Sequence, residues 1–378
     1  MKVVWFSEIK WTYLTTRKQQ IIRRFPGDWQ ILFVESYAIG KKNGFIPKRD
    51  GNVIYATVPF FKATPYAAFN RFQSFVIIRF LMTALAGLWV RLLCRFTGFY
   101  SENRVICTSN IYYADIIRRM KKRLMVYDCN DYPLGFSSTL TFAKTYFEKT
   151  IRQSDLTTTV SQKLLDDIRP FKSENIFVIG NGVDFELFDG APVVGTPPEM
   201  KSISSPIIFF SGALSDWLDT ELIQKIGENI PEAAVVLLGP VKSDETRTAI
   251  EQLTKSGNVF WIGEKKHAEL PAYIRRAAVC MLPFKMNRRI IGANPNTLYE
   301  FLSCGKPVVT LNYSDEIQKL APHVLVAQDA DDFLKKIKIA LNSTPDTNAL
   351  KNIARENSWD LKAAAFAKLI TDHLREKK

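Results

Sequence analysis

Residues 294–309 hold the side chains whose types and spacing are best suited to chemistry. Pro295 can occupy the first turn of a short helix, where its missing N–H is no loss, and Gly305 with Pro307 can end that helix. The open amides at the helix start carry partial positive charge and favour a phosphate group. Glu300, inside the helix, can accept hydrogen bonds from the two hydroxyls of a ribose. The pattern therefore predicts a site for a nucleotide diphosphate.

Groups elsewhere in the C-terminal half support the same interpretation. Lys285, Arg288 and Arg289 lie just upstream and add positive charge. A glycine at the carboxyl end of a strand allows a phosphate to approach closely. The alternative is a capped surface helix with a solvated glutamate. The predicted ligand-binding residues are Gly212, Gly263, Lys285, Arg288, Asn294, Asn296, Thr297, Leu298 and Glu300.

Two carboxylates follow a predicted strand at residues 124–127, namely Asp128 and Asp131. The carboxyl ends of parallel strands are where open α/β sheets bind their ligands. Asp131 is the candidate catalytic base, which would take a proton from an acceptor hydroxyl. Asp128 is a second catalytic candidate, as the partner that orients it. The alternative is that either residue caps the next helix.

The composition is that of an ordinary globular α/β protein, with 378 residues and 47% hydrophobic side chains, enough for two or three domains. The five cysteines are scattered, and no signal peptide is evident, so we expect a reducing cytoplasm. The three histidines and these cysteines form no local cluster with metal-ligand spacing. We therefore expect neither a catalytic metal nor a cofactor.

Positive charge is concentrated in the N-terminal part of the chain. Residues 1–150 hold 23 Lys and Arg against 9 Asp and Glu, whereas residues 151–378 hold 28 against 29. Such a basic region suggests an anionic partner, which could be a membrane surface, a lipid-linked phosphate or a nucleic acid. No recognisable DNA or RNA module accompanies the charge, so a nucleic-acid partner is not expected.

Residues 69–100 combine many aromatic side chains with the arginines at 71, 79, 91 and 95. The charge-free run 80–90 is eleven residues, well short of the roughly 20 that a spanning helix needs, so we predict no spanning helix. We favour a helix in the membrane interface whose arginines reach the headgroups, supported by the basic pairs Lys41-Lys42 and Lys48-Arg49. The alternative is a core helix with exposed arginines. The expected location is the inner face of the plasma membrane, with peripheral attachment from the cytoplasm.

Apolar runs at 3–7, 31–35 and 53–58 predict buried parallel strands and a Rossmann-like opening. No Gly-x-Gly-x-x-Gly follows the first strand, which argues against a dinucleotide cofactor there. A second strand series begins at residue 207, after a Gly- and Pro-rich passage. We predict an acceptor and membrane-contact domain over 1–185, a second Rossmann-like domain over 203–345, and terminal helices over 346–378 that pack back across the domain interface.

These residues resemble the GT-B glycosyltransferases, especially bacterial members of glycosyltransferase family 4 and xanthan-type glucuronosyltransferases. The resemblance covers the linker and most of the C-terminal domain. It is carried by Ile179-Gly180-Asn181-Gly182-Val183-Asp184, Asn294-Pro295-Asn296, Leu298-Tyr299-Glu300-Phe301 and Gly305-Lys306-Pro307-Val308-Val309. In the N-terminal domain, Trp11 and Arg17 are similar to a loop-helix pattern of bacterial polysaccharide enzymes, and are the predicted acceptor-binding residues.

The resemblance implies an α/β fold of two doubly wound domains facing a central cleft. It also implies transfer of a sugar from a nucleotide donor, more often UDP-linked, to a lipid-linked or polysaccharide acceptor in surface polysaccharide assembly, without a metal. Thr297 stands where many relatives carry Lys, and Gly292 stands where retaining members often carry Glu. We therefore favour an inverting reaction with Asp131 as base. The alternative from another class is a non-catalytic GT-B-like protein that binds a nucleotide sugar or glycan.

Overall fold

The structure is a computed structural model that describes residues 1–13, 15–40, 42–61, 64, 66–135, 140–190 and 195–377. Its contacts divide the chain into two units: unit 1 is Met1–Gly180 with Lys362–Lys378, and unit 2 is Asn181–Leu361. The first division falls a few residues before the predicted boundary at 185, and the second falls inside the predicted terminal helices. Lys41 of the predicted basic loop and residues 191–194 of the predicted linker lie outside the described residues.

Unit 1 is built on one sheet in the order β3-β4-β2-β1-β5-β6-β7-β8. All neighbouring strands are parallel except β3 and β4. The strands are β1 (Lys2–Ser7), β2 (Gln30–Tyr37), β3 (Lys48–Asp50), β4 (Val53–Phe61), β5 (Val105–Thr108), β6 (Leu124–Cys129), β7 (Leu156–Thr159) and β8 (Ile176–Val178). The helices are α1 (Arg17–Arg23), α2 (Ala67–Gln73), α3 (Val76–Phe96), α4 (Ala114–Arg118), α5 (Ala143–Gln153), α6 (Gln162–Ile168) and most of α16 (Trp359–Glu376).

The central strands form because short runs of apolar residues are buried on both faces of the sheet. Val3, Val4 and Phe6 of β1 are fully buried, and β1 pairs in parallel register with both β2 and β5. The chain leaves β1 toward β2 and β4 on one side, and then returns to β5 on the other. The boundary between β1 and β5 is therefore the topological switch point of unit 1, where ligands of open α/β sheets bind.

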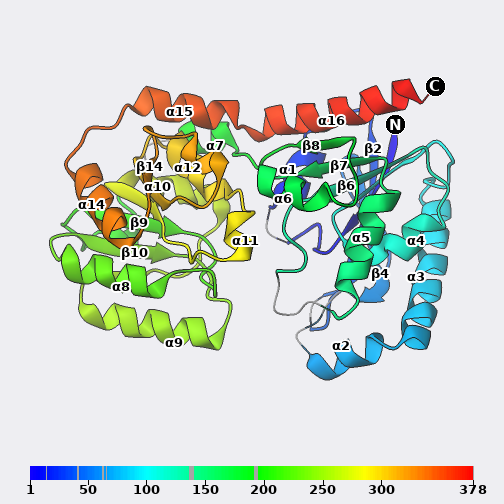
Figure 1. The fold of residues 1–378 in the computed structure, drawn as a ribbon, viewed down its shortest axis with the longest axis horizontal. Coiled ribbons are helices and arrows are strands. Elements are labelled where there is room, and N and C mark those ends of the chain that lie inside the picture. The colour runs from blue at the N-terminus through cyan, green and yellow to red at the C-terminus, as the bar shows by residue number, and fades with distance from the viewer. Residues whose placement is uncertain are drawn as a thin grey trace. The chain divides into compact units, whose positions relative to one another are not determined.

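Helix α3 buries only a narrow stripe, formed by Thr83, Ala86, Val90, Leu93 and Cys94. Figure 1 shows it running along one side of unit 1, with α2 next to its amino end. By length and composition alone α3 could cross a membrane, so the apolar helix is longer than the charge-free run indicated, while the prediction that it does not span stays a prediction. The charge-free run is shorter than the helix because the helix extends past Arg79 at one end and past Arg91 and Arg95 at the other. Only 22% of its apolar window is buried.

Unit 2 contains a parallel sheet in the order β11-β10-β9-β12-β13-β14. Its strands are β9 (Ile207–Ser211), β10 (Ala234–Leu238), β11 (Val259–Trp261), β12 (Val279–Leu282), β13 (Val308–Leu311) and β14 (Leu325–Ala327). Its helices are α7 (Phe185–Asp189), α8 (Thr220–Asn229), α9 (Asp244–Leu253), α10 (Leu270–Arg276), α11 (Arg288–Ile291), α12 (Asn296–Ser303), α13 (Asp315–Gln318), α14 (Ala330–Leu341) and α15 (Thr347–Glu356). The chain reverses direction between β9 and β12, which is the switch point of this sheet. The predicted fold class of two Rossmann-like domains is confirmed.

The last helix contributes to the core of unit 1. Phe366 of α16 stacks on Trp5 of β1 with ring centroids 5.6 Å apart and also contacts Phe25 at 6.0 Å. Trp5 and Phe366 are both fully buried. Unit 1 is therefore made from two segments that are separated in sequence by the whole of unit 2.

Candidate active site

In unit 2, two predicted binding residues lie at the switch point of the sheet. Gly212 follows β9 directly, and Lys285 lies just after β12 with an exposed side chain. Parallel strands direct their carboxyl ends to one edge, so these residues share the edge where ligands of such sheets bind. The local sequence patterns that predicted Gly212 and Lys285 therefore point to the carboxyl edge of this sheet, and their role in binding stays a prediction.

The loops after β9, β10 and β11 approach one another closely through glycines. A Cβ built on Gly239 would lie 1.8 Å from the carbonyl oxygen of Gly212, so no side chain fits there. The amide of Gly239 donates to the carbonyl of Gly263 at 2.8 Å. Gly263 has a left-handed φ of 74°, yet a Cβ on it would find no atom within 4 Å. The predicted Gly263 therefore faces open space, and Gly239, which the sequence reasoning missed, sets the loop spacing.

Helix α12 begins at Asn296, one residue after Pro295, close to the predicted position. The first hydrogen bond of this turn runs from the amide of Leu298 to the carbonyl of Pro295 at 3.3 Å, so the amides of Asn296 and Thr297 precede it. Within the described chain, the Oδ1 atom of Asn296 is buried without a hydrogen-bond partner. The open backbone amides at a helix start are suited to an anionic group, whereas the Oδ1 of Asn296 is an acceptor and needs a donor.

Two predicted residues of this helix start serve the protein framework. The Oδ1 of Asn294 accepts from the amide of Asn181 at 3.0 Å, and the side chain of Asn181 donates back to the carbonyl of Asn294 at 2.6 Å. The side chain of Leu298 is buried in the core of unit 2, at 1% exposure. Asn294 therefore anchors the start of unit 2 and Leu298 packs in its core, and their side chains are not placed for ligand contact.

Glu300 lies inside α12 and is 8% exposed, so its carboxylate needs polar partners. The Nε2 of His267, just before α10, lies 3.2 Å from the Oε1 of Glu300. Burial by itself lowers the pKa of His267, but the hydrogen bond and charge of Glu300, with a smaller contribution from Asp184, outweigh burial and raise that pKa above its ordinary value. His267 was missed in the sequence because 33 residues separate it from Glu300. Phe188 packs edge-on against its ring at 5.3 Å.

The basic residues before α12 are held by different contacts. Asn287 caps α11, accepting from the amides of Arg289 and Ile290, and this places the half-buried Arg288 in the first turn. The guanidinium of Arg289 lies over the ring of Trp217 at 4.3 Å. A cation held against an aromatic face remains positively charged. These residues keep positive charge on the segment between β12 and α12.

In unit 1, the predicted Asp128 and Arg17 form a buried ion pair. Asp128 is fully buried, and the Nη2 of Arg17 lies 3.0 Å from its Oδ1, which also accepts from the Thr158 hydroxyl at 2.8 Å. Arg17 is 3% exposed and donates as well to the carbonyl of Gly180 at 2.9 Å. Arg17 therefore satisfies the charge of Asp128 and ties α1 to the sheet, so neither side chain is placed to contact substrate.

The predicted Trp11 is also part of the framework. It is 2% exposed, its indole donates to Asp50 at 2.8 Å, and its backbone amide donates to Glu35 at 2.7 Å. Asp131, by contrast, is half-buried just beyond β6, where its backbone carbonyl accepts a weak hydrogen bond from the thiol of Cys129. Among the predicted residues of unit 1, Asp131 is the one that keeps partial access to solvent.

A carboxylate that the sequence reasoning missed lies at the switch point of unit 1. Glu8 directly follows β1, and its Oε2 accepts from the hydroxyl of Ser109, which directly follows β5, at 2.9 Å. Its Oε1 lies 2.5 Å from the Nζ of Lys18, which is 2% exposed, while Glu8 is 29% exposed. The only signal in the sequence was the position of Glu8 at the end of the first strand.

Within the described residues, no three side chains of His, Cys, Asp or Glu come together as a set that could hold a metal ion. The described cysteines are free thiols, and burial raises the pKa of Cys129 to about 12 despite the opposing effect of its hydrogen bond with Tyr127. A thiol with such a pKa is a poor nucleophile at neutral pH. The candidate chemistry in both units is therefore carried by carboxylates, basic side chains and backbone amides.

Comparisons with known proteins agree with this geometry. Residues 202–357 match the family model for glycosyl transferases group 1. A similar sequence is TuaH of Bacillus subtilis (strain 168), whose name assigns it a glycosyltransferase role in teichuronic acid biosynthesis. It is 24% identical over 254 residues, which are 62% of this chain and 64% of the relative. The match thus spans somewhat less than two thirds of that protein.

Solved structures are similar over nearly the whole chain. Sucrose-phosphate synthase from Thermosynechococcus elongatus has a TM-score of 0.75 and 13% identity, with 99% of each chain covered. An E. coli trehalose-6-phosphate structure bound with UDP-2-fluoro glucose has a TM-score of 0.73 and 11% identity, again with 99% of each covered. Anabaena HepE in complex with UDP has a TM-score of 0.66 and 14% identity, covering 98% of this chain and 100% of that one.

At these identities the structural similarity shows the fold, and the family match covers the C-terminal part of the chain. The fold similarity and the family match both agree with the resemblance that the motifs around Glu300 indicated. The chain has the GT-B fold, and its residues 202–357 form a glycosyltransferase group 1 domain.

Proposed function

We propose that the protein is a glycosyltransferase that moves a sugar from a nucleotide-diphosphate donor to a glycan acceptor in surface polysaccharide biosynthesis. The name of the Bacillus relative supports this class of pathway, and the two structural neighbours described with UDP or a UDP-sugar support a UDP-linked donor. The acceptor we propose is lipid-linked or a growing polysaccharide. Unit 2 binds the donor and unit 1 binds the acceptor.

The observation that carries this proposal is the Glu300 carboxylate inside α12, held by His267 on one oxygen. With Oε1 engaged, Oε2 is the oxygen that accepts from the ribose hydroxyls. The start of α12, about one turn earlier, then faces the diphosphate, and Gly263 leaves space at the neighbouring strand end. Lys285 and Arg288 supply positive charge to the leaving diphosphate, which stabilises the charge that develops in the transition state.

We assign Asp131 as the base that accepts the proton of the acceptor hydroxyl, and this favours inversion at the sugar carbon. Its partial exposure at the carboxyl end of β6 supports that role, whereas Asp128 is fully buried and supports it less well. Glu8 is the second carboxylate to test, because it lies partly exposed at the switch point. No metal-dependent step is part of the proposal.

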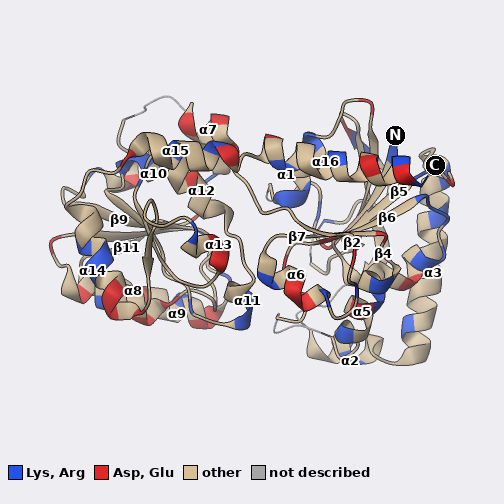
Figure 2. Cartoon of the chain, turned by 45° about the horizontal axis from the view of Figure 1, so that its top comes forward, with Lys and Arg blue, Asp and Glu red and all other residues tan. Residues whose placement is uncertain are grey.

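We also propose that unit 1 attaches peripherally to the inner face of the plasma membrane. Of the 22 exposed large hydrophobic side chains of the described chain, 13 lie within residues 66–100. Contiguous apolar surface of this kind marks interaction sites. Helix α3 carries arginines but no acidic residue (Figure 2), which suits an anionic membrane. Its buried stripe packs on the sheet of unit 1, and this supports a helix lying at the surface over one that crosses the bilayer.

Thermal stability in the presence of nucleotides tests the donor assignment. We expect one of UDP, GDP, TDP and ADP to raise the unfolding midpoint of the wild-type protein, and the effect to be lost in Glu300→Ala. A ligand at 100 times its dissociation constant stabilises the folded state by about 2.7 kcal/mol, enough for a readable shift. Leu298, buried in the same helix, is unsuitable as a control, so Glu316→Ala in α13 serves as the matched carboxylate removal. A shift that survives in Glu300→Ala would place the nucleotide elsewhere.

Turnover of the sugar nucleotide distinguishes an enzyme from a non-catalytic glycan-binding protein. We expect Asp131→Asn to lower kcat by roughly 10²–10⁴-fold while nucleotide binding is kept, the range for loss of a general base. Unchanged turnover in Asp131→Asn together with a large loss in Glu8→Gln would transfer the role to Glu8. Nucleotide binding without any turnover, across a panel of UDP-sugars and lipid-linked acceptors, would favour the non-catalytic alternative.

A further inference from the structure

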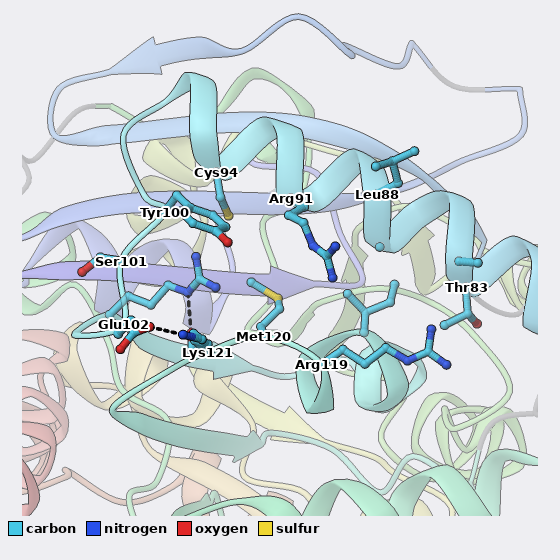
Figure 3. A pocket seen from close by; sticks show the side chains of 14 residues that line it. Thr83, Leu88, Arg91, Cys94, Tyr100, Ser101, Glu102, Arg119, Met120 and Lys121 are labelled. Atoms are coloured by element: carbon cyan, nitrogen blue, oxygen red, sulfur yellow. Dashed lines mark hydrogen bonds and ion pairs between the residues drawn. The ribbon is translucent and has the colours of Figure 1, made fainter.

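Unit 1 contains a cavity of about 600 Å³ that none of the proposed transfer chemistry uses. It lies between α3, α4 and the segment that precedes β5. Figure 3 shows Arg91 reaching into it from α3, with Arg119 on the opposite side. Basic side chains outnumber acidic ones around it. Its charged lining residues are Arg91, Glu102, Arg104, Arg119 and Lys121.

Two of these cations already make hydrogen bonds or an ion pair within the protein. Arg104 is 4% exposed and donates to the carbonyls of Lys121 and Phe99, both at 2.9 Å. The ammonium of Lys121 pairs with Glu102, the acidic residue of the lining. In the described part of the chain, Arg91 and Arg119 have no carboxylate within 4.0 Å. The guanidinium of Arg119 is held instead near the ring of the exposed Phe80, at 5.8 Å.

The wall formed by α3 leaves room for a ligand because its residues are small. Thr83, Ala84 and Gly87 face the cavity. A Cβ built on Gly87 would meet no atom within 4 Å. The side chain of Leu88 also lines the cavity and is 55% exposed, which makes the rim continuous with the exposed apolar face of α3. A phosphate on the two arginines would thus have apolar surface beside it.

The cavity lies at the opposite edge of the sheet from the proposed catalytic base. Its lining residues Arg104 and Lys121 precede β5 and β6, whereas Asp131 follows β6. Strand β6 has six residues, so the two edges are roughly 20 Å apart. A sugar acceptor bound in the cavity would be out of reach of Asp131. The cavity therefore suits a ligand that positions unit 1, as opposed to one that reacts.

We propose that this cavity binds the phosphate of an anionic phospholipid headgroup, with Arg91 and Arg119 as its charged hydrogen-bond donors. Guanidinium groups form short, charge-assisted hydrogen bonds to phosphate, often in pairs. The acyl chains of the lipid lie along the exposed apolar face of α3. The site thereby fixes how deeply and at what angle unit 1 sits on the membrane. The inference rests on the proposed membrane contact of unit 1 and is independent of the transfer chemistry.

The test measures binding of the full chain to vesicles of phosphatidylcholine with and without phosphatidylglycerol, by co-sedimentation at near-physiological salt. The key variant is Gly87→Leu, which fills the cavity, keeps every charge and adds apolar surface. We expect it to bind phosphatidylglycerol vesicles about tenfold more weakly than wild type, as expected for loss of a pair of charge-assisted contacts. If the apolar face of α3 inserted into the membrane without a specific headgroup site, Gly87→Leu would bind these vesicles more strongly than wild type.

Charge removal gives a second, matched comparison. Arg91→Gln with Arg119→Gln removes the two cavity arginines, whereas Arg95→Gln with Arg118→Gln removes one exposed arginine from each of the same two helices outside the cavity. Both pairs lose the same net charge, so they lose the same general attraction to the membrane. We expect the first pair to weaken binding at least about threefold more than the second, because it also loses the contacts to the phosphate. Near-UV circular dichroism and unfolding midpoints confirm that all variants are folded.

Each outcome decides one point. Equal losses in the two charge pairs, with unchanged or stronger binding in Gly87→Leu, would overturn the headgroup site and leave the membrane contact standing. Failure of the wild-type protein to bind any vesicle would overturn both, while sugar transfer in solution would still be tested separately. Stabilisation by inorganic phosphate equal to that by dihexanoyl phosphatidylglycerol would assign the site to free phosphate. Duplex DNA binding lost only in the Arg91 and Arg119 variant would assign it to nucleic acid.

Discussion

The carboxyl edges of the two sheets differ in how their charged residues are used. In unit 1, the fully buried Asp128 is paired with the buried cation Arg17. In unit 2, the Glu300 carboxylate contacts a single partly exposed histidine, and Lys285 is exposed. A charge that is fully paired inside the protein stabilises the fold, whereas one with remaining capacity can bind a ligand. Similar residue types at equivalent sheet edges thus serve different purposes.

Removing the buried cation of unit 1 is the strongest test of this difference between the two sheets. We expect Arg17→Met to lower the free energy of unfolding by about 3–5 kcal/mol, because it leaves Asp128 charged and buried without its partner. Arg23→Met is the control on the same helix, since Arg23 lies 3.8 Å from Asp50 in an exposed pair worth about 1 kcal/mol or less. Urea unfolding measures both. Equal losses of unfolding free energy in the two variants would show that the buried ion pair stabilises the fold no more than the exposed one.

A pair of glycines in unit 2 gives the next largest expected effect. Gly239→Ala places a methyl group 1.8 Å from the carbonyl oxygen of Gly212, so the loops must separate, and we expect a loss of about 3 kcal/mol or more. Gly263→Ala meets no atom within 4 Å and carries only the strain of its left-handed backbone, about 1–2 kcal/mol. Thermal unfolding compares them. The comparison fails if Gly263→Ala is the more destabilising change.

The smallest expected effect is a pH dependence in unit 2. Because the folded-state pKa of His267 is raised, its pairing with Glu300 contributes stability that is fully present below the unfolded value of about 6.5. That contribution is lost as the pH rises through the higher folded pKa. We expect His267→Gln to cost at most about 1 kcal/mol at pH 6 and less at pH 8.5, since the pair is partly exposed. A difference that grows with pH would contradict the assignment.

The sequence predicted what depends on neighbouring residues. The buried runs identified most of the parallel strands, and the helix carrying Glu300 was predicted within a few residues. Strand β3 was missed because Lys48, Arg49 and Asp50 form a charged antiparallel edge strand without an apolar pattern. Strand β14 was missed because three residues are too few to show a period.

What the sequence could not supply were pairings between distant residues. Arg17 and Asp128 are 111 positions apart, so nothing local showed that each neutralises the other. Glu8 was overlooked because its importance depends on β5 returning beside β1, which places Ser109 against it. The acceptor-side residues were chosen by resemblance alone, and the structure uses Trp11 and Arg17 to hold the framework.

The return of the chain to unit 1 also bears on the order of folding. The ring of Phe366 covers Trp5, and the carbonyl of Leu374 accepts from Arg123, so the N-terminal core lacks these contacts until the last helix has been synthesised. Unit 2 is a continuous segment and can complete its core first. At about 5–20 residues per second, a nascent N-terminal sheet would wait many seconds for its final helix. During synthesis, the unit that begins first is therefore the one that is finished last.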